Sequence, residues 1–549
     1  MEKILTKQRK ICNWPPDAFA FAGYLLHTTG AYRKAVNNEW WGKVEPEHPQ
    51  GVLRLGIKWR ASASMGKPAP AMIQSRWNTV LKAHSLPISL IVKDCTEQPS
   101  RNLIRALFDL VAAADEACKG MGLPFDDIPE EGVEYSLYAK AENLLIRSTL
   151  NRGEASSLCE NVDSEVVCVL PKMHTPQVGL TFRSLTHHLA LCPRDEVVPV
   201  WNPTPGAFTS QRNAELNLLV VPYPYKIDKA QFVALKTGTQ CGRHKLAHEF
   251  RQFAFDVKPH DGWLEKDLPQ ILEAARKRAP ENRIDGVIFP ELSLRGRGEL
   301  ISAYKQIASI SPSAFLVAGV AEASRNGEKA THFNTAQFVV PILPGRISIY
   351  RQEKHHRWRL DKRQIKDYGI HAQLASGVSW WEQMNVAERE LNFVALKQRL
   401  TCCVLVCEDL ARQEPASRVV RAVAPTLLIS LLMDGPQLRG RWPGRYVAVL
   451  GEDPGLAVLT LTSAGMVQLS NDNQKKRPKR SVVALWRDAE DSHEIPLARG
   501  AQAVLLSVQP VPRTEYSADG REDAKAGALV LKKEDIRQIK IKIVNHQKK

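Results

Sequence analysis

Glu291, Lys354 and Cys407 are the residues of this sequence whose types and positions best fit a common chemistry. They follow three largely apolar runs, Gly286–Phe289, Arg346–Tyr350 and Leu400–Val406. A cysteine attacks carbonyl and nitrile carbons as its thiolate, which is scarce at a free pKa of roughly 8.5. A nearby lysine favours the thiolate, and a carboxylate can accept the thiol proton and pass it to a leaving amine. Cys407, Lys354 and Glu291 therefore fit the roles of nucleophile, charge-stabilising partner and general base.

These side chains can meet only if the apolar runs before them are strands of an α/β sheet. Ligands collect at the carboxyl ends of strands in open α/β sheets, so residues that follow different strands can share one pocket. From Leu216 onward, apolar runs alternate with amphipathic helices, and strands predominate after residue 320. The expected helices are Trp263–Arg278 and Glu299–Ser309. Further expected strands are Leu216–Val221, Ala314–Val320, Pro425–Leu432, Leu456–Thr462, Ser481–Trp486 and Ala503–Val508, with a hairpin of Asn334–Pro341 and Arg346–Tyr350.

From about Leu216 to Val511 the sequence resembles the nitrilase superfamily. The resemblance rests on an ordered set of motifs: Pro290-Glu291-Leu292 after an apolar strand, FNTAQFVVP at Phe333–Pro341, Lys354 after an aromatic-rich strand, and Cys407-Glu408-Asp409. The last of these is similar to the nucleophile motif of the glutaminase-type branch. The order Glu, Lys, Cys also agrees with the family.

The resemblance implies an α/β fold of the nitrilase-like four-layer α-β-β-α sandwich type. It implies hydrolysis of a non-peptide carbon–nitrogen bond, in an amide, nitrile or carbamoyl substrate, by Cys407, Glu291 and Lys354 through a covalent thioester-type intermediate. No metal or cofactor is expected. Family members usually dimerise, so a homo-oligomer (a dimer or larger) is also implied.

Other residues are candidates for supporting roles in the same site. Many family members have a second glutamate between the lysine and the cysteine, and Glu382 is the candidate here, ahead of Glu388 and Glu390. Cys407 stands where a strand gives way to a helix, so the backbone N–H of Glu408 is a candidate second donor to an oxyanion. Asp434 and Arg441 follow the next strand and are candidate residues of the substrate pocket, although a plain solvated loop is an equal alternative.

Residues 1–205 contain no comparable motif and are expected to form a mixed α/β N-terminal domain of unknown role. The Pro- and Gly-rich stretch Val198–Phe208 is the expected linker. Residues 206–515 would form the hydrolase domain, and 516–549 a basic C-terminal tail that alternates apolar and cationic residues like an edge strand. Within the N-terminal domain we expect strands at Gly51–Arg60, Leu86–Val92 and Glu165–Leu170 and a helix at Asn102–Lys119.

Bulk composition narrows the class of protein. A length of 549 residues suits two or three domains, and 24% charged residues is ordinary for a globular chain. The sequence has neither an apolar run near the roughly 20 residues of a membrane span nor a secretory signal, so we expect a cytoplasmic protein without a membrane partner. Its ten cysteines include no C-x-x-C pair, which argues against structural zinc.

A formal net charge of +16 leaves room for a nucleic-acid or protein partner, although a solvated basic face is the favoured explanation. The alternative to an amide- or nitrile-cleaving enzyme is therefore a catalytically silent or regulated nitrilase-like module in a larger bacterial assembly, such as one for antiphage (antiviral) defence. The N-terminal domain would then bind the protein or nucleic-acid partner.

Overall fold

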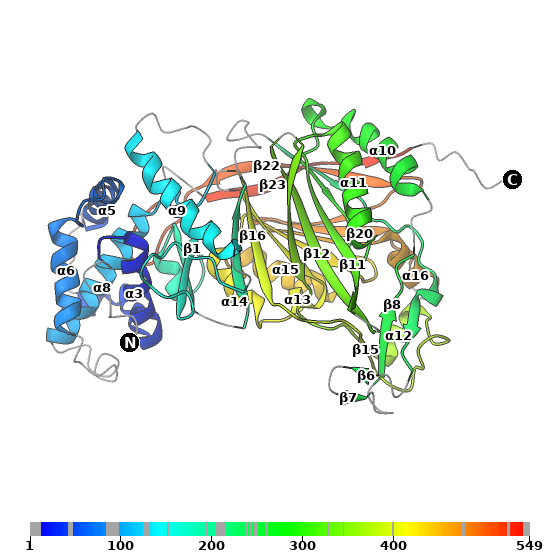
Figure 1. The fold of residues 1–549 in the computed structure, drawn as a ribbon, viewed down its shortest axis with the longest axis horizontal. Helices are drawn as coiled ribbons and strands as arrows, with labels where there is room; N and C mark the ends of the chain where they lie inside the picture. The colour runs from blue at the N-terminus through cyan, green and yellow to red at the C-terminus, as the bar shows by residue number, and fades with distance from the viewer. Residues whose placement is uncertain are drawn as a thin grey trace.

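The computed structural model describes residues 12–541 except 42–47, 84–97, 125–131, 151–152, 194–195, 205–214, 237–239, 242–243, 246–250, 259–261, 327–328, 344, 398–399, 474–477 and 524–527. The strand expected at Leu86–Val92 lies outside the described residues. The protein is a mixed α/β structure with several sheets and many helices (Figure 1).

Two large sheets dominate the structure. The eight-stranded sheet has the order β13-β12-β11-β9-β4-β22-β23, with β10 paired to β11, and the seven-stranded sheet has the order β21-β20-β19-β18-β17-β16-β3. The first sheet contains β4 (Leu216–Val220), β9 (Gly286–Ile288), β10 (Leu294–Arg295), β11 (Phe315–Asn326), β12 (Lys329–Leu343), β13 (Arg346–Glu353), β22 (Ala503–Arg513) and β23 (Ala528–Ile539). The second contains β3 (Val198–Pro203), β16 (Glu390–Lys397), β17 (Leu400–Val406), β18 (Leu427–Leu432), β19 (Ala457–Thr462), β20 (Val482–Arg487) and β21 (Ser492–Pro496).

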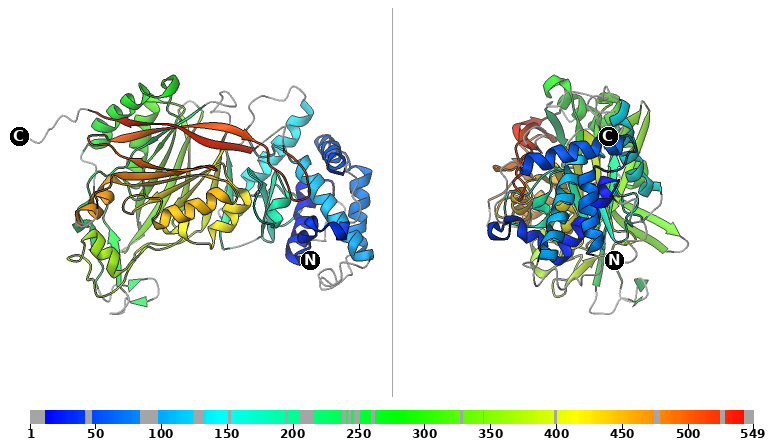
Figure 2. Two further views of the ribbon diagram at one scale, coloured as in Figure 1. Left: turned by 180° about the vertical axis from the view of Figure 1, so that it is seen from behind. Right: turned by 90° about the vertical axis from the view of Figure 1, so that its left-hand side faces the viewer.

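The two sheets pack face to face, and helices cover their outer faces (Figures 1 and 2). β4 shows how the sequence builds these layers. Leu218 and Val220 point into the core between the sheets, whereas Leu219 points to the outer core beneath the helices, because successive side chains of a strand alternate. A strand buried on both faces is mostly apolar, and β4 is apolar except for Asn217, whose side chain accepts a hydrogen bond from Ser507. The outer helices are α10 (Trp263–Arg276) and α11 (Gly296–Ile310) on the first sheet, and α14 (Ala416–Val423) and α15 (Trp442–Glu452) on the second.

A smaller four-stranded sheet lies at one end of the large sheets (Figure 1). Its order is β14-β15-β8-β5, and its aromatic residues Phe253, Trp358 and Trp380 share a core with Met433 from the segment after β18. This core therefore lies beside the carboxyl ends of the large-sheet strands. The elements are β5 (Phe232–Ala234), β8 (Arg251–Phe255), β14 (Arg359–Leu360), β15 (Trp380–Glu382), α12 (Lys362–Tyr368) and α16 (Ala464–Asn473), with a separate β6–β7 pair at Gln240–Cys241 and His244–Lys245.

The N-terminal part consists mainly of helices, and Gly51–Arg60 is helical rather than the expected strand. Ten residues of alternating character also fit a helix whose buried side carries Val52, Gly56 and Trp59. A Cβ at Gly56 would lie 2.5 Å from Glu116 Cβ, so the glycine allows close helix packing. The helices are α3 (Pro15–Thr29), α4 (Asn38–Trp41), α5 (His48–Ser64), α6 (Ala71–Lys82), α8 (Gln98–Ala117) and α9 (Gly132–Leu150).

Two other elements expected in the N-terminal part, one helix and one strand, are confirmed. Helix α8 occupies the stretch where helical spacing predicted one, and β1 (Val167–Pro171) overlaps the strand predicted at Glu165–Leu170. Strand β1 pairs with β2 (Leu189–Pro193) in a separate two-stranded sheet.

The predicted linker is wrong over its first half. Val198–Pro203 is strand β3, which pairs in parallel with β16 at the edge of the seven-stranded sheet. Proline suggested a linker, but an edge strand tolerates Pro199 and Pro203 because only one side must donate hydrogen bonds. The C-terminal tail, in contrast, contains an edge strand as expected: β23 pairs with β22 at the edge of the eight-stranded sheet.

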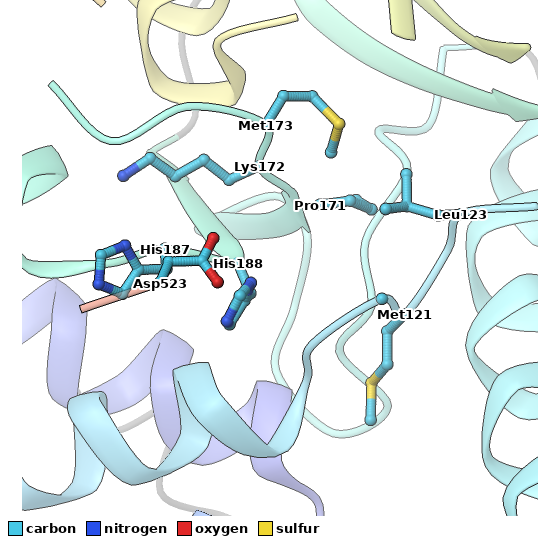
Figure 3. Close-up of a pocket in the computed structure, with 9 residues that line it drawn as sticks. Met121, Leu123, Pro171, Lys172, Met173, His187, His188 and Asp523 are labelled. Carbon is cyan, nitrogen blue, oxygen red and sulfur yellow. The ribbon is translucent and has the colours of Figure 1, made fainter. Parts of the chain in front are cut away.

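A small cavity lies where the N-terminal helices, β1 and the loop before β23 meet (Figure 3). Its volume is about 20 Å³, which suits one water molecule. His187, His188, Lys172 and Asp523 line it together with Met121, Leu123 and Met173. Burial lowers the pKa of Lys172 to about 7, and the Lys172 Nζ donates to the Thr186 hydroxyl at 2.9 Å.

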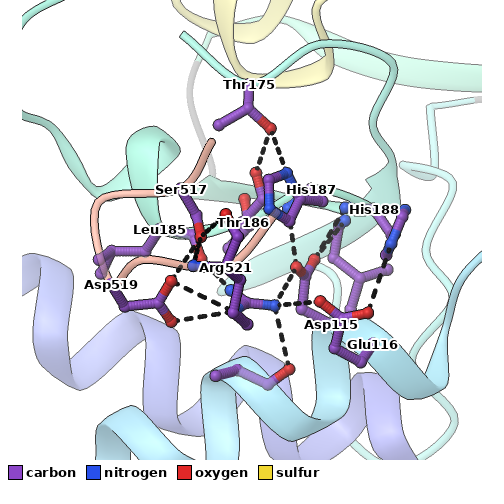
Figure 4. Close-up of polar contacts among 12 residues, drawn as sticks. Asp115, Glu116, Thr175, Leu185, Thr186, His187, His188, Ser517, Asp519 and Arg521 are labelled. Carbon is purple, nitrogen blue, oxygen red and sulfur yellow. Dashed lines mark hydrogen bonds and ion pairs between the residues drawn. The ribbon is translucent and has the colours of Figure 1, made fainter. Parts of the chain in front are cut away.

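Beside this cavity, a buried ionic cluster ties the loop before β23 to helix α8 (Figure 4). Arg521 donates to Asp115 at 3.1 Å and to Glu116 at 2.7 Å. Asp115 also accepts the backbone N–H groups of His187, His188 and Leu189 at 2.7–2.9 Å. Removing one partner of such a buried pair is costly, so the cluster fixes segments that lie more than 400 residues apart.

Among the described residues, no helix combines the length and the apolar character that a membrane crossing requires.

Candidate active site

Glu291, Lys354, Glu382 and Cys407 meet at the ends of four strands from three sheets. Glu291 follows β9, Lys354 follows β13, Glu382 ends β15 and Cys407 follows β17. Lys354 Nζ donates to Glu291 Oε1 at 2.8 Å and to Glu382 Oε2 at 2.6 Å. All four residues are buried, with exposed fractions of 3%, 0%, 5% and 2% respectively. The charges of Glu291 and Lys354 act on the Cys407 thiol, so the four residues form one buried cluster of two acids, an amine and a thiol.

Asn334 completes the cluster and received no role in the sequence analysis. Its Nδ2 donates to Glu291 Oε1 at 2.7 Å and to Glu382 Oε1 at 2.8 Å, so one amide bridges the two carboxylates. The backbone N–H of Trp358 donates to Glu382 Oε2 at 3.0 Å. Glu291 Oε2, in contrast, is buried without a hydrogen-bond partner in the described part of the chain. That oxygen is the one free to accept a proton.

Two tight turns present the acid and the thiol. Cys407 has φ 48° and ψ −106°, and it immediately precedes the short helix α13 (Glu408–Ala411). Leu292, directly after Glu291, has φ 52°. Non-glycine residues seldom adopt positive φ, and such strain gathers at functional sites. The peptide N–H of Cys407 donates to Leu431 O at 2.9 Å, which ties the turn to the neighbouring strand β18.

A glycine makes room for the turn at Glu291. A Cβ at Gly319 on β11 would lie 2.4 Å from Glu291 Cα and from Pro290 O. Such a distance is impossible without moving main-chain atoms. Gly319 therefore allows the backbone of Glu291 to approach the neighbouring strand.

The electrostatics of the cluster fix its resting protonation. Burial and the charge of Glu291 raise the pKa of the Cys407 thiol well above its usual value, although Lys354 opposes them. Burial also raises the pKa of Glu291, against the lowering effect of Lys354. Burial disfavours the ammonium of Lys354, but Glu291 and Glu382 outweigh it and raise the Lys354 pKa well above its usual value. A protonated thiol thus lies beside a carboxylate of raised basicity and a permanent cation.

The remaining predicted residues occupy different places. Glu388 and Glu390 lie before and at the start of β16, and the backbone N–H of Glu388 donates to Glu353. The side chain of Glu408 pairs with Arg412 at 2.7 Å, while its peptide N–H belongs to the first turn of α13, where helical N–H groups lack helical acceptors.

Asp434 and Arg441 contact each other rather than standing free. Arg441 Nη2 and the Tyr368 hydroxyl both donate to Asp434 Oδ1, at 2.8 and 2.7 Å. Asp434 directly follows Met433, whose backbone hydrogen-bonds to Cys407. Asp434 Oδ2 is buried with no partner among the described residues. Tyr368 was not among the predicted site residues, because a tyrosine in a short helix carries no sequence signal of a distant carboxylate partner.

No family model matches the chain, and no curated protein matches it by sequence. Solved structures do show a likeness. An amidase from Nesterenkonia sp. AN1 is 12% identical with a TM-score of 0.31, covering 55% of this chain and 92% of that one. Nit3 from Saccharomyces cerevisiae, a member of branch 10 of the nitrilase superfamily, is 11% identical with a TM-score of 0.30. The match covers 60% of this chain and 92% of that one.

A CN-hydrolase superfamily protein from Xanthomonas campestris is 13% identical with a TM-score of 0.27, covering 59% of this chain and 89% of that one.

Proposed function

We propose that this protein hydrolyses a non-peptide carbon–nitrogen bond of an amide, nitrile or carbamoyl compound with Cys407 as nucleophile. The observation that carries the proposal is the buried ion pair of Lys354 with Glu291 and Glu382 beside the Cys407 thiol. A buried, protonated lysine held by two acids next to a thiol is costly to maintain for stability alone. Such perturbed groups concentrate at functional sites.

For an amide substrate, the reaction runs in two halves. Glu291 takes the thiol proton through its free Oε2, and the sulfur forms a bond to the carbonyl carbon. The oxyanion that appears is stabilised by Lys354 and by the N–H of Glu408. Glu291 then gives the proton to the amide nitrogen, and the C–N bond breaks to leave a thioester. A water molecule gives a proton to Glu291, attacks the thioester and releases the acid, and Glu291 returns the proton to the sulfur.

Each supporting residue keeps this arrangement in place. Glu382 holds Lys354 protonated, because its charge raises the lysine pKa. Asn334 fixes both carboxylates and leaves Glu291 Oε2 free. Asp434, beside the Cys407 turn, offers its free Oδ2 to an N–H donor of the substrate. The motifs shared with the nitrilase superfamily at Pro290–Leu292, Phe333–Pro341 and Cys407–Asp409 support the same chemistry and its four-layer sandwich.

The deciding experiment is mass spectrometry of the intact protein after incubation with a panel of small amides and nitriles. We expect an acyl adduct on Cys407 in the wild type, and trapping of that adduct by added hydroxylamine as a hydroxamate. Cys407→Ala should abolish both, while Cys403→Ala, which removes a buried thiol of the preceding strand, should retain them. Absence of any adduct and of turnover in a folded wild type across the panel would overturn the proposal in favour of a non-catalytic module.

A further inference from the structure

The strands that carry Lys354 and Cys407 belong to different sheets. Lys354 follows β13 of the eight-stranded sheet, and Cys407 follows β17 of the seven-stranded sheet. Apolar side chains fill the space between these sheets. Apolar packing has no direction, so it tolerates small sliding of one sheet against the other. A fixed distance between the lysine and the thiol therefore needs directed bonds from sheet to sheet.

Asp409 makes such bonds at the level of the two residues. It lies two positions after Cys407 in helix α13, and its carboxylate accepts backbone N–H groups from the other sheet's segment. Both oxygens accept from His355 N at 3.1 Å, and Oδ1 also accepts from His356 N at 2.9 Å. His355 directly follows Lys354. One buried carboxylate therefore joins the turn of the thiol to the backbone of the lysine.

A second set of polar contacts joins the two sheets two to three residues before Lys354 and Cys407. Gln352 on β13 donates through Nε2 to Val404 O on β17 at 2.7 Å, and its Oε1 accepts from Asn392 N on β16 at 3.0 Å. These contacts join the carboxyl end of β13 to β16 and β17 of the other sheet. Asp409 is the contact closest to the reacting groups, since it lies two residues after Cys407 and its partner His355 directly follows Lys354.

We propose that Asp409 is a positioning residue that sets the distance between Lys354 and Cys407 across the two sheets. The inference rests on the proposed function for its consequence, because that distance decides how strongly the ammonium stabilises the thiolate and the oxyanion. The ionised form does this work, since an anion accepts on both oxygens whereas the protonated acid must place a donor hydrogen against an N–H group.

The surroundings of Asp409 make this contact sensitive to pH near neutrality. Burial raises the pKa of Asp409 to about 7, against the backbone N–H of His355 and the charge of Lys354, which lower it. The facing groups are Lys354, His355 and His356 from the segment after β13, with Glu408 on its own helix. Burial lowers the pKa of His355 to about 4, so His355 brings no positive charge at neutral pH. Below a pH of about 7 the junction should therefore loosen.

Asp409→Asn tests the proposal, because an asparagine of the same shape accepts through one oxygen and turns an N–H₂ group toward a backbone N–H. Two readouts apply to the full-length protein, and neither needs a substrate. One is hydrogen exchange of the peptide that contains His355 and His356. The other is the rate of Cys407 alkylation by iodoacetamide from pH 6 to 10. Asp256→Asn is the matched control, because that carboxylate is exposed and pairs with Lys258.

In Asp409→Asn we expect hydrogen exchange at the His355 and His356 amides to become about tenfold faster. We expect Cys407 alkylation at pH 8 to become about tenfold slower, which corresponds to a rise of one unit in the pKa of the thiol. The control should match the wild type. Unchanged exchange and unchanged alkylation in Asp409→Asn would overturn the inference. If that variant does not fold, wild-type exchange at the same two amides, corrected for intrinsic pH dependence, must lose protection between pH 8 and 6, and constant protection would equally overturn it.

The experiment separates this inference from the proposed function. A wild type without amide turnover, whose Cys407 alkylation nevertheless slows in Asp409→Asn, would refute the enzyme and leave the positioning role intact. If the wild type turns over an amide but Asp409→Asn changes neither alkylation nor exchange, the proposed enzyme stands and the positioning role is refuted.

Discussion

Replacing Lys354 with methionine should leave two buried acids without their counter-charge. Methionine keeps a long apolar stem, so the change removes the ammonium with little loss of volume. The ammonium contacts Glu291 at 2.8 Å and Glu382 at 2.6 Å, and each of the three side chains is at most 7% exposed. Breaking a buried pair in this way typically costs about 3–5 kcal/mol. We expect a loss of that size in the free energy of unfolding of Lys354→Met at pH 8.

The loss should depend on pH in a defined direction. Burial and the charge of Glu382 raise the pKa of Glu291, and the loss of the ammonium removes the charge that opposes them. A group whose pKa is higher in the folded than in the unfolded protein stabilises the folded state fully at a pH below its unfolded pKa. That stabilisation is lost as the pH rises through its folded pKa. Lys354→Met should therefore approach the wild type near pH 5 and fall behind it toward pH 8.

Urea unfolding followed by tryptophan fluorescence at pH 5 and pH 8 measures this difference. Lys305→Met removes an exposed cation from α11 and should change stability by less than about 0.5 kcal/mol. Lys354→Met with Glu382→Gln should recover part of the loss, because one buried charge has gone. A Lys354→Met protein as stable as the wild type at pH 8, with no dependence on pH, would refute the argument that the two acids are ionised in the cluster.

Three further changes give expected outcomes elsewhere in the structure. Gly319→Ala should displace the main chain at Glu291, because its Cβ would lie 2.4 Å from Glu291 Cα, and should lower the initial rate of any amide hydrolysis more than it lowers the thermal midpoint. Arg521→Met should cost about 3–5 kcal/mol by stranding Asp115 and Glu116, and limited proteolysis should then cut the loop before β23 faster. Tyr368→Phe removes one donor to a buried carboxylate and should cost about 1–3 kcal/mol in urea unfolding, whereas an exposed Tyr446→Phe should cost nothing measurable.

Much of the architecture after residue 216 is visible in the sequence because burial on both faces leaves runs that are apolar except for a single polar residue. β4, β17 and β18 are such runs, and each has every residue buried. The polar residues that follow them stand out for the same reason. The positions of Glu291, Lys354 and Cys407 after such runs therefore predicted that they would lie together, whereas Glu382 was predicted only from the family resemblance.

The residues that hold the cluster together are not identifiable from a pattern in the sequence. Asn334 is one amide within a strand, and its two carboxylate partners lie 43 and 48 residues away. Asp409 bonds to backbone N–H groups, which every residue except proline has, so no side-chain pattern identifies its partners. The error at Gly51–Arg60 has another origin. Ten residues of mixed character fit the periodicity of a strand as well as that of a helix, and packing against α8 decides in favour of the helix.

The charge balance of the cluster explains why the proposed site needs a second acid that does not itself exchange protons. In the proposed resting state, one ammonium, two carboxylates and a neutral thiol carry a net charge of −1. During attack a proton moves from sulfur to Glu291 while negative charge appears on the substrate oxygen, so the net charge of the buried site stays constant and only its position changes. Moving charge within a buried site avoids the large cost of creating it there.

This balance requires Lys354 to remain protonated when Glu291 becomes neutral, and from then on Glu382 is the carboxylate that holds it. Glu382→Gln should therefore slow the acylation half of the reaction even though Glu382 touches neither thiol nor substrate, and an acylation rate equal to that of the wild type in single-turnover measurements would show that Glu291 alone suffices.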